Sequence, residues 1–333
     1  MGDLMITRLH LVLIVLLCVA CGDEPRGDGV LISLTSVDSS SVGGELNDGG
    51  LGQGTSSLGD VQGMDVPDAV AARPPIDVPV APVVTGTCPE LSAGTNTFTI
   101  SGTARSADVF LPETPAGAPV VFIWHGLGDS AGNMGRAFGA SGLTNQYGAI
   151  VVVPHSSGQF PQSEWSFFGG NPAVDGDFFD EMLGCVDQAY DVDMNRIYTT
   201  GFSAGALWST WLLMNRSEYL AAVVLFSGGA GGVNPYGTPS HDTPVLAFHG
   251  GPSDIFAGGF LNFSMMTTEL AGNLVDDGHF VIVCDHNGGH RIPLDPRAYA
   301  FPFMFDHHFD DEGSAYAEGL GEVWPDFCGI RSN

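Results

Sequence analysis

Short runs of apolar residues recur along the chain from residue 119 onward, separated by polar or helical segments. Most runs are rich in valine, isoleucine, leucine, alanine or phenylalanine, which is typical of strands covered on both faces of a sheet, and the run at 196–200 is β-branched and aromatic instead. The strands expected from these runs span 119–124, 149–153, 196–200, 221–226, 245–248 and 280–283. Two segments ahead of them, 98–100 and 107–111, are expected to form an opening antiparallel pair.

Longer segments with a helical character lie between these strands. The expected helices span 178–190, 206–214 and 262–277. Strands that alternate with helices predict an α/β fold, with a mostly parallel central sheet and helices on both of its faces.

The first residues of the chain differ from the rest. An arginine precedes an apolar run that is too short to span a bilayer, which predicts a secretory signal peptide over 1–20. The sequence Cys18-Val19-Ala20-Cys21 resembles a bacterial lipobox, with Cys18 in place of the usual leucine. Cys21 is then the expected lipidated residue, anchored to a membrane, and ordinary cleavage after Ala20 is the alternative. Both interpretations predict an exported protein, lipid-anchored to the bacterial cell envelope or secreted.

Residues 21–86 are rich in glycine, serine, aspartate, valine and proline, and they show no sustained apolar period. Such a segment cannot bury enough apolar surface to offset the entropy of ordering, so a disordered acidic stalk is expected. The remaining residues, 87–333, have the size of a single catalytic domain with one core.

The charge of the chain narrows the range of partners. It carries 38 acidic residues against 10 lysine and arginine residues, which gives a formal net charge of −28. Such a field repels polyanions, so nucleic acid is excluded as a partner and neutral esters are favoured as substrates.

Four of the six cysteines lie beyond the first 21 residues: Cys88, Cys185, Cys284 and Cys328. An even number in an exported domain predicts two disulfides, for which three connectivities are possible. We favour Cys88–Cys185 with Cys284–Cys328. No metal site is expected, because these four cysteines form no C-x-x-C pair.

The segment Gly201-Phe202-Ser203-Ala204-Gly205 carries the clearest chemical signal in the chain. It has the form G-x-S-x-G and lies between an expected strand and an expected helix, which is the setting of a nucleophile elbow. The sharp turn strains the serine backbone, and the two glycines leave room for it. Ser203 is therefore the expected nucleophile, and the positive end of the following helix points at the site.

The loop His125-Gly126-Leu127-Gly128 directly follows another expected strand. Its glycines allow backbone N–H groups to turn inward, so the amides of Leu127 and Ala204 are the expected oxyanion hole. The imidazole of His125 is expected to brace this loop rather than to transfer protons.

Two further groups follow the last two parallel strands, at the same edge of the sheet. Asp254 comes after the strand at 245–248 and is the expected carboxylate that orients the catalytic histidine. His290 follows the strand at 280–283 and is the expected general base, with His286 as the nearest rival and His279 as a weaker one. The resulting order of serine, aspartate and histidine is that of the α/β-hydrolases.

Together these motifs resemble the exported polyhydroxybutyrate depolymerase and feruloyl esterase group of α/β-hydrolase serine esterases. The resemblance extends over most of 88–328 and includes the segment 191–198 before the elbow. The loop that carries Asp254 is one residue longer than the spacing usual in that group. No polymer-binding domain follows the catalytic domain in this sequence, which argues against a crystalline polyester substrate.

The resemblance implies a serine carboxylesterase that needs no metal or organic cofactor and that acts on small or oligomeric esters. Hydroxybutyrate oligomers, feruloyl esters, acetyl esters and short-chain esters all fit. Trp165, in a long loop after the strand at 149–153, is the expected wall of a substrate pocket. A peptidase and a non-catalytic surface binding protein on the same fold are the alternatives.

Overall fold

The computed structural model describes residues 77–157, 165–166, 171–293 and 297–332. The strands of its main sheet lie in the order β1-β2-β4-β3-β5-β6-β7-β10-β11. The central strands, from β4 to β10, are parallel, and antiparallel pairings occur only toward the two edges of this described sheet. The strands are β1 (Gly94–Ile100), β2 (Thr103–Phe110), β3 (Val120–Trp124), β4 (Ile150–Pro154), β5 (Ile197–Phe202), β6 (Ala222–Phe226), β7 (Val245–His249), β10 (Val281–Asp285) and β11 (Cys328–Ile330).

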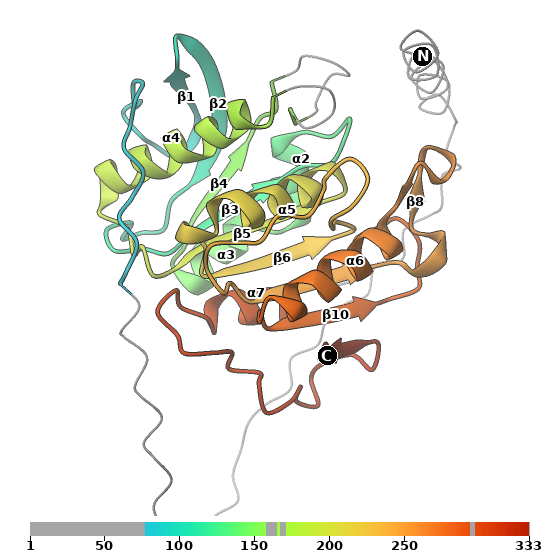
Figure 1. Cartoon of the computed structure of the whole chain (residues 1–333). Coiled ribbons are helices and arrows are strands. Elements are labelled where there is room, and N and C mark those ends of the chain that lie inside the picture. Colours follow the sequence, from blue (N-terminus) through green and yellow to red (C-terminus); the bar gives the residue numbers. More distant parts are fainter. Residues whose placement is uncertain (1–76, 158–164, 167–170, 294–296, 333) are drawn as a thin grey trace, which may run out of the picture. The chain divides into compact units, whose positions relative to one another are not determined.

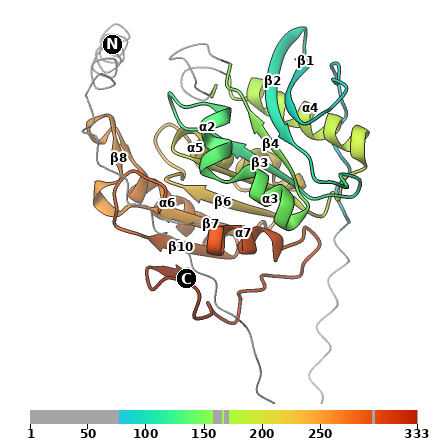
Figure 2. The ribbon, with the colours of Figure 1, turned by 180° about the vertical axis from the view of Figure 1, so that it is seen from behind.

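The main helices pack in two layers on the sheet, as Figures 1 and 2 show from opposite sides. One layer consists of α4, α5 and α6, and the other of α2, α3 and α7. Their bounds are α2 (Ala131–Ala137), α3 (Ala140–Tyr147), α4 (Ala173–Tyr190), α5 (Ala204–Arg216), α6 (Phe263–Asp276) and α7 (Arg297–Phe305). This arrangement confirms the predicted fold, a mostly parallel sheet with helices on both faces.

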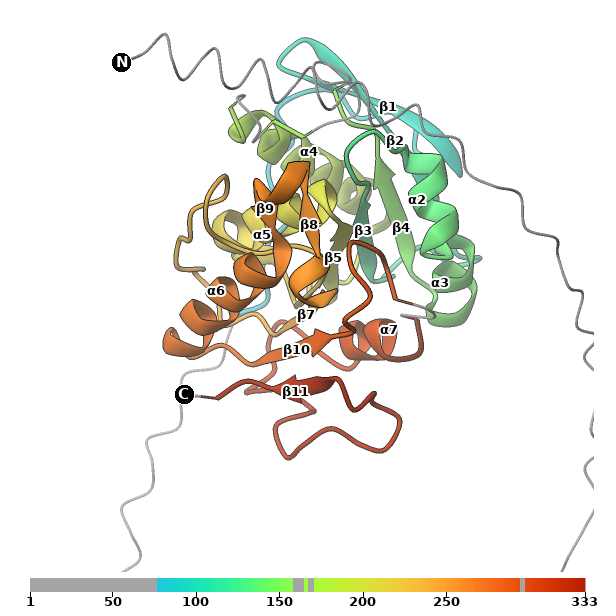
Figure 3. The same cartoon turned by 90° about the vertical axis from the view of Figure 1, so that its right-hand side faces the viewer.

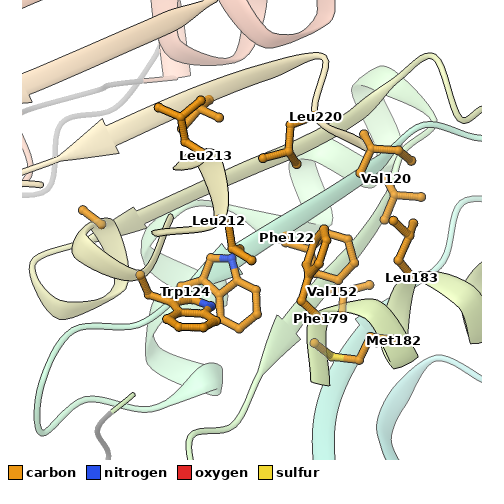
Figure 4. Close-up of a cluster of buried hydrophobic side chains, with 14 of the residues drawn as sticks. Val120, Phe122, Trp124, Val152, Phe179, Met182, Leu183, Leu212, Leu213 and Leu220 are labelled. Atoms are coloured by element: carbon orange, nitrogen blue, oxygen red, sulfur yellow. The ribbon is translucent and has the colours of Figure 1, made fainter. Parts of the chain in front are cut away.

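The central strands are apolar along their whole length because each face of the sheet is covered. In β3 the side chains of Val120, Phe122 and Trp124 enter the core under α4 and α5, whereas Val121 and Ile123 enter the opposite core. Figure 4 shows the first of these cores, where side chains of α4 and α5 meet those of β3. Successive residues of a strand point to opposite faces, so a continuous apolar run supplies both cores.

Two disulfides join distant parts of the chain, and both predicted pairings are confirmed. Cys88 ahead of β1 is bonded to Cys185 of α4, and Cys284 of β10 is bonded to Cys328 of β11. The second pair lies directly opposite in the antiparallel register of the edge strand. Disulfides persist in oxidising compartments, which is consistent with an extracellular protein.

Packed structure begins ahead of residue 87. Ala81 and Val84 contact the core beside α4, and the N–H groups of Thr85 and Gly86 donate hydrogen bonds to the carboxylate of Glu181. Most of the expected stalk and the whole leader, including Cys21, lie outside the described residues. The division into leader, stalk and domain therefore stays a prediction.

Several described elements have no counterpart in the sequence-based prediction. Helices α2, α3 and α7 and the edge strand β11 were not expected, and α4 begins five residues earlier than predicted. A small hairpin, β8 (Ile255–Phe256) with β9 (Leu261–Asn262), follows β7 through the 3₁₀ turn η2 (Gly251–Ser253). No helix in the described ranges has the length and apolar character needed to cross a membrane.

Candidate active site

Ser203 lies in the turn between β5 and α5, with the strained backbone expected of a nucleophile elbow. Its φ is 56° and its ψ is −120°, a combination that non-glycine residues rarely adopt. Its N–H donates to the carbonyl of Phe226 at the end of the neighbouring strand β6. The turn therefore holds the serine side chain at the carboxyl edge of the sheet.

The two glycines of the motif are required by close backbone contacts. A Cβ atom at Gly201 would lie 2.5 Å from the carbonyl group of Gly205, and one at Gly205 would overlap the carbonyl oxygen of Trp124. Both positions thus exclude any side chain, as the motif predicted. As a result, the start of α5 lies in close backbone contact with β3 and β5.

A chain of hydrogen bonds joins the three expected catalytic side chains. The Oγ atom of Ser203 lies 2.9 Å from Nε2 of His290, and Nδ1 of the same imidazole lies 2.7 Å from Oδ1 of Asp254. Since a carboxylate only accepts, Nδ1 carries the proton, and Nε2 is left to accept from the serine hydroxyl. The residues come from three separate loops at the carboxyl ends of β5, β7 and β10.

Asp254 has no exposed surface, and its carboxylate is fully paired. Burial by itself would raise the pKa of Asp254, but hydrogen bonds from His290, the Gly250 N–H and the Ser227 hydroxyl outweigh it and lower that pKa below its ordinary value. The Gly250 and Ser227 donors both lie 2.8 Å from Oδ2. Asp254 is therefore an anion with its second oxygen held by groups other than the histidine.

Sequence reasoning did not find Ser227. It follows β6 directly and has a positive φ of 55°, so its side chain turns toward the end of β7. The only sequence signal for this role is that the serine directly follows a parallel strand adjacent to the elbow strand, and this signal is weak.

Aromatic rings enclose the imidazole of His290. The ring of Phe263 stacks on it with 4.6 Å between centroids, and the ring of Phe202 lies 4.8 Å away. Phe256 contributes a third ring at 6.3 Å. Packing of this kind restricts rotation of the imidazole and leaves its edge free for hydrogen bonding.

The two rival histidines, His286 and His279, form hydrogen bonds with groups other than Ser203. His286 accepts a hydrogen bond from the Gly288 N–H at Nδ1, and burial lowers its pKa. His279 contacts the carbonyl of Thr243 before β7, at the opposite end of that strand. Only His290 of the three is hydrogen-bonded to Ser203 in the described structure, so the geometry selects it over its rivals.

The predicted oxyanion donors lie beside the serine. Ala204 is the first residue of α5, so its N–H has no acceptor within the helix. Gly126, which precedes Leu127, approaches so closely that a Cβ there would lie 3.5 Å from the Cβ of Ser203. Within the described ranges, the Leu127 N–H donates no backbone hydrogen bond. Leu127 and Ala204 therefore stay the predicted donors of the oxyanion hole.

His125 braces this loop, as expected. Its Nδ1 lies 2.9 Å from the Gly126 carbonyl, and its Nε2 lies 3.4 Å from the Ser156 nitrogen. Because Ser156 donates an N–H, Nε2 accepts and Nδ1 donates, which is the neutral form. Burial lowers the pKa of His125, in agreement with a neutral ring.

Trp165 does not line an open pocket. It has no exposed surface, and its indole N–H donates to the His125 carbonyl at 2.9 Å. Its ring packs against His125, Trp124 and Trp208. The expected role as a pocket wall is therefore wrong for this position, because a fully covered ring offers substrate no surface. Trp165 supports the loop of Leu127 from behind.

Within the described ranges, no group of three or more histidine, cysteine, aspartate or glutamate side chains is arranged to hold a metal ion. A buried ion pair joins Arg105 to Asp175, and the second carboxylate oxygen of Asp175 accepts from the Ser166 N–H. Asp175 thus holds the backbone of Ser166, the residue that follows Trp165.

The sequence is similar to known esterases over part of its length. Feruloyl esterase D of Neurospora crassa is 31% identical over 170 residues, which are 45% of this chain and 56% of that protein. The putative esterase NocK of Nocardia uniformis subsp. tsuyamanensis is 26% identical over 141 residues, 42% of this chain and 41% of that protein. The chain spans about half the length of these curated relatives. No family model matches it.

Solved structures share the fold. The native sOPH structure has a TM-score of 0.58 at 20% identity, and the match covers 74% of this chain and 96% of that chain. The native pOPH structure is similar, with a TM-score of 0.58 at 19% identity, covering 74% and 96%. The chain has the α/β-hydrolase fold. Its sequence is similar to esterases, which confirms the predicted resemblance to the feruloyl esterase group.

Proposed function

We propose that the chain is an exported serine carboxylesterase in which Ser203 is the nucleophile, His290 the general base and Asp254 the residue that orients the base. The observation that carries this proposal is the unbroken hydrogen-bonded row of these side chains, 2.9 Å and 2.7 Å between atoms, on a strained elbow. Such a row matches the roles of a serine hydrolase triad.

The first half of the reaction forms an acyl-enzyme. Nε2 of His290 takes the Ser203 proton while Oγ attacks the ester carbonyl carbon, and a tetrahedral intermediate forms. The N–H groups of Leu127 and Ala204 stabilise its oxyanion, and Asp254 stabilises the imidazolium. The intermediate then collapses as His290 gives its proton to the leaving alcohol oxygen.

The second half regenerates the enzyme. A water molecule gives a proton to Nε2 of His290 and attacks the acyl carbonyl, and the same two amides hold the second oxyanion. Collapse releases the carboxylic acid and returns the proton to Ser203. Every proton transfer passes through the one imidazole edge that the aromatic rings leave open.

The substrate class proposed here is a neutral carboxylic ester. The names of the relatives support feruloyl and acetyl esters as the first candidates, since an acetylxylan esterase of Aspergillus awamori is also similar, at 27% identity over 129 residues. Hydroxybutyrate oligomers and simple short-chain esters belong in the same substrate panel. The net charge of −28 supports uncharged over polyanionic substrates.

Export is part of the proposal. A signal peptide over 1–20 and lipidation at Cys21 would place the domain outside the cytoplasm, attached to the envelope membrane. Metabolic labelling with a radioactive fatty acid tests the anchor: label is expected in the full chain and lost in Cys21→Ser. Equal labelling of both would exclude Cys21 as the acceptor.

The esterase proposal is tested with purified protein on p-nitrophenyl acetate, ethyl ferulate and a chromogenic peptide. Ester turnover is expected, and Ser203→Ala should lower it by on the order of 10⁴-fold. Ser141→Ala, an exposed serine on α3, is the matched control and should keep full activity. Undiminished ester turnover by Ser203→Ala, or turnover of the peptide alone, would contradict the proposal.

A further inference from the structure

The two oxygens of the Asp254 carboxylate have different partners. Oδ1 faces Nδ1 of His290, whereas Oδ2 accepts from the hydroxyl of Ser227, which directly follows β6, at 2.8 Å. The Gly250 N–H, at the end of β7, donates to Oδ2 at 2.8 Å as well. The Gly250 carbonyl in turn accepts from the N–H of Gly289, one residue before His290. Oδ2 thus joins the ends of two strands to the loop that carries the proposed base.

The backbone of Ser227 has a conformation that costs serine energy. Its φ of 55° lies in the left-handed region, where a Cβ atom is strained and glycine is favoured. Its N–H donates to the Phe248 carbonyl of β7, so the strained residue is held in place. A glycine here would relieve the strain but would remove one donor from Oδ2 of Asp254. Strain at a site residue therefore points to a function for this hydroxyl.

The turn that carries Ser227 is held between two helices. Helices α5 and α6 lie next to each other on one face of the sheet (Figures 1 and 3). Thr210 of α5 accepts from the Gly229 N–H at 3.2 Å, and Thr267 of α6 donates to the Gly228 carbonyl at 2.9 Å. Only 1% of the surface of Ser227 is exposed. The hydroxyl therefore reaches the carboxylate from a rigid part of the protein.

Such a donor can set the orientation of the carboxylate. The torsion about the Cβ–Cγ bond of an aspartate is broad, so a carboxylate with a single partner turns easily. Two donors on Oδ2, from the ends of separate strands, oppose this turn and keep Oδ1 in line with the imidazole. We propose that Ser227 is a positioning residue, whose hydroxyl holds Asp254 in the orientation that aligns His290 with Ser203. This inference rests on the proposed esterase function.

Removal of the hydroxyl tests the proposal. Ser227→Ala should lower kcat for p-nitrophenyl acetate about tenfold with KM little changed, because the base is aligned in a smaller fraction of the molecules. Ser227→Gly should lose a similar factor, since it also lacks the hydroxyl, although it relieves the strained backbone and so protects the fold. Full kcat in Ser227→Gly would show that the hydroxyl is not needed and would overturn the proposal.

The matched control is Ser217→Ala. Ser217 is also fully buried but lies ahead of β6, at the other end of that strand, where its hydroxyl accepts from the N–H groups of Ser240 and His241. Its loss should lower the free energy of unfolding without lowering kcat. An equal loss of kcat in Ser217→Ala and Ser227→Ala would point to general destabilisation and would contradict a positioning role.

A double-mutant cycle shows whether Ser227 acts through Asp254. In the background of Asp254→Ala, the addition of Ser227→Ala should change kcat by no more than about twofold, because no carboxylate is left to hold. A loss of about tenfold in both backgrounds would mean that the hydroxyl acts by another route, and the proposal would fail.

Proton NMR gives a readout that needs no turnover. The Nδ1 proton of His290, shared with a buried carboxylate, should give a downfield resonance that disappears in His290→Gln. This resonance should shift or broaden in Ser227→Ala and stay in place in Ser217→Ala. A resonance that is unchanged in Ser227→Ala would overturn the inference. A resonance that responds as expected in a protein that hydrolyses no ester would support the positioning role and remove the esterase proposal alone.

Discussion

The imidazole of His290 lies nearly parallel to the ring of Phe263, with 4.6 Å between centroids and 14° between planes. Phe263 is fully buried and is the first residue of α6, so the start of that helix sets the plane of the imidazole. The carboxylate of Asp254 fixes the direction of the Nδ1–H bond in this plane. Stacking and hydrogen bonding together therefore orient the base.

The first prediction concerns Phe263 as a positioning residue. Phe263→Leu keeps an apolar side chain but removes the flat surface, so the imidazole gains rotational freedom and kcat should fall about tenfold with KM little changed. Phe98→Leu, in the core at β1, is the matched control: it should lower the free energy of unfolding to a similar degree, by about 1 kcal/mol, without lowering kcat. Equal kcat in both variants would leave Phe263 with a structural role alone.

The second prediction concerns acid stability. Burial lowers the pKa of four histidines below the ordinary value of 6.5: His125, His249, His286 and His307. Below pH 6.5 the unfolded chain binds more protons at these positions than the folded chain does. The free energy of unfolding should therefore fall as the pH drops below 6.5. Above pH 6.5 these four histidines should add no pH dependence to it.

Urea unfolding between pH 7.5 and 5 measures this slope. Each such histidine adds at most about 1.4 kcal/mol per pH unit, since one proton is taken up on unfolding. His125→Gln should reduce the slope by up to one proton, whereas Ser141→Ala, at an exposed position with no titratable group, should leave it unchanged. A free energy of unfolding that rises on acidification through this range would refute the assignment.

The third prediction concerns the elbow glycines. Gly205→Ala puts a methyl group onto the backbone of Trp124, so α5 must move away from β3 and the free energy of unfolding should fall by about 3 kcal/mol or more. Gly142→Ala is the control: it lies in α3 with open space around it, and it should be neutral or stabilise by about 0.5–1 kcal/mol. Thermal and urea unfolding measure the stabilities of the two variants. Equal stabilities would show that Gly205 does not lie in close contact with the backbone of Trp124.

The fourth prediction concerns the support of the oxyanion loop. Trp165→Phe keeps the aromatic packing but removes the N–H that holds the His125 carbonyl. The loop of Leu127 should become less well placed, and kcat should fall about fivefold to tenfold while KM stays similar. Trp211→Phe, on α5, should have no such effect. If both variants keep full kcat, the hydrogen bond to His125 does not contribute to placing the donors.

Much of the fold follows from the pattern of apolar residues. Strands such as β3 and β6 are apolar on both faces, and this requires a sheet covered on both sides whatever the partners are. Helix α3 and strand β11 escaped prediction because their local patterns are weak. Strand β11 has three residues, and its place depends on pairing with β10 and on the disulfide of Cys328.

In the candidate site, too, some residues could be predicted from the sequence and others could not. Ser203 was visible because an elbow needs glycines at two fixed offsets, and Asp254 and His290 were visible because parallel strands bring their carboxyl ends to one edge. Trp165 was misjudged, since burial of a loop tryptophan depends on what covers it. Ser227 was missed for a related reason: its bond to Asp254 joins residues 27 apart in sequence.

The sequence by itself determined the central parallel strands, three of the helices between them, the elbow and the three side chains expected at its edge, because these depend on local periodicity and on the geometry of parallel strands. Only the tertiary structure decided which histidine reaches Ser203, which ring stacks on it, and which serine donates a hydrogen bond to Asp254. Those relationships depend on contacts between segments far apart in the chain, for which local sequence carries no periodic signal.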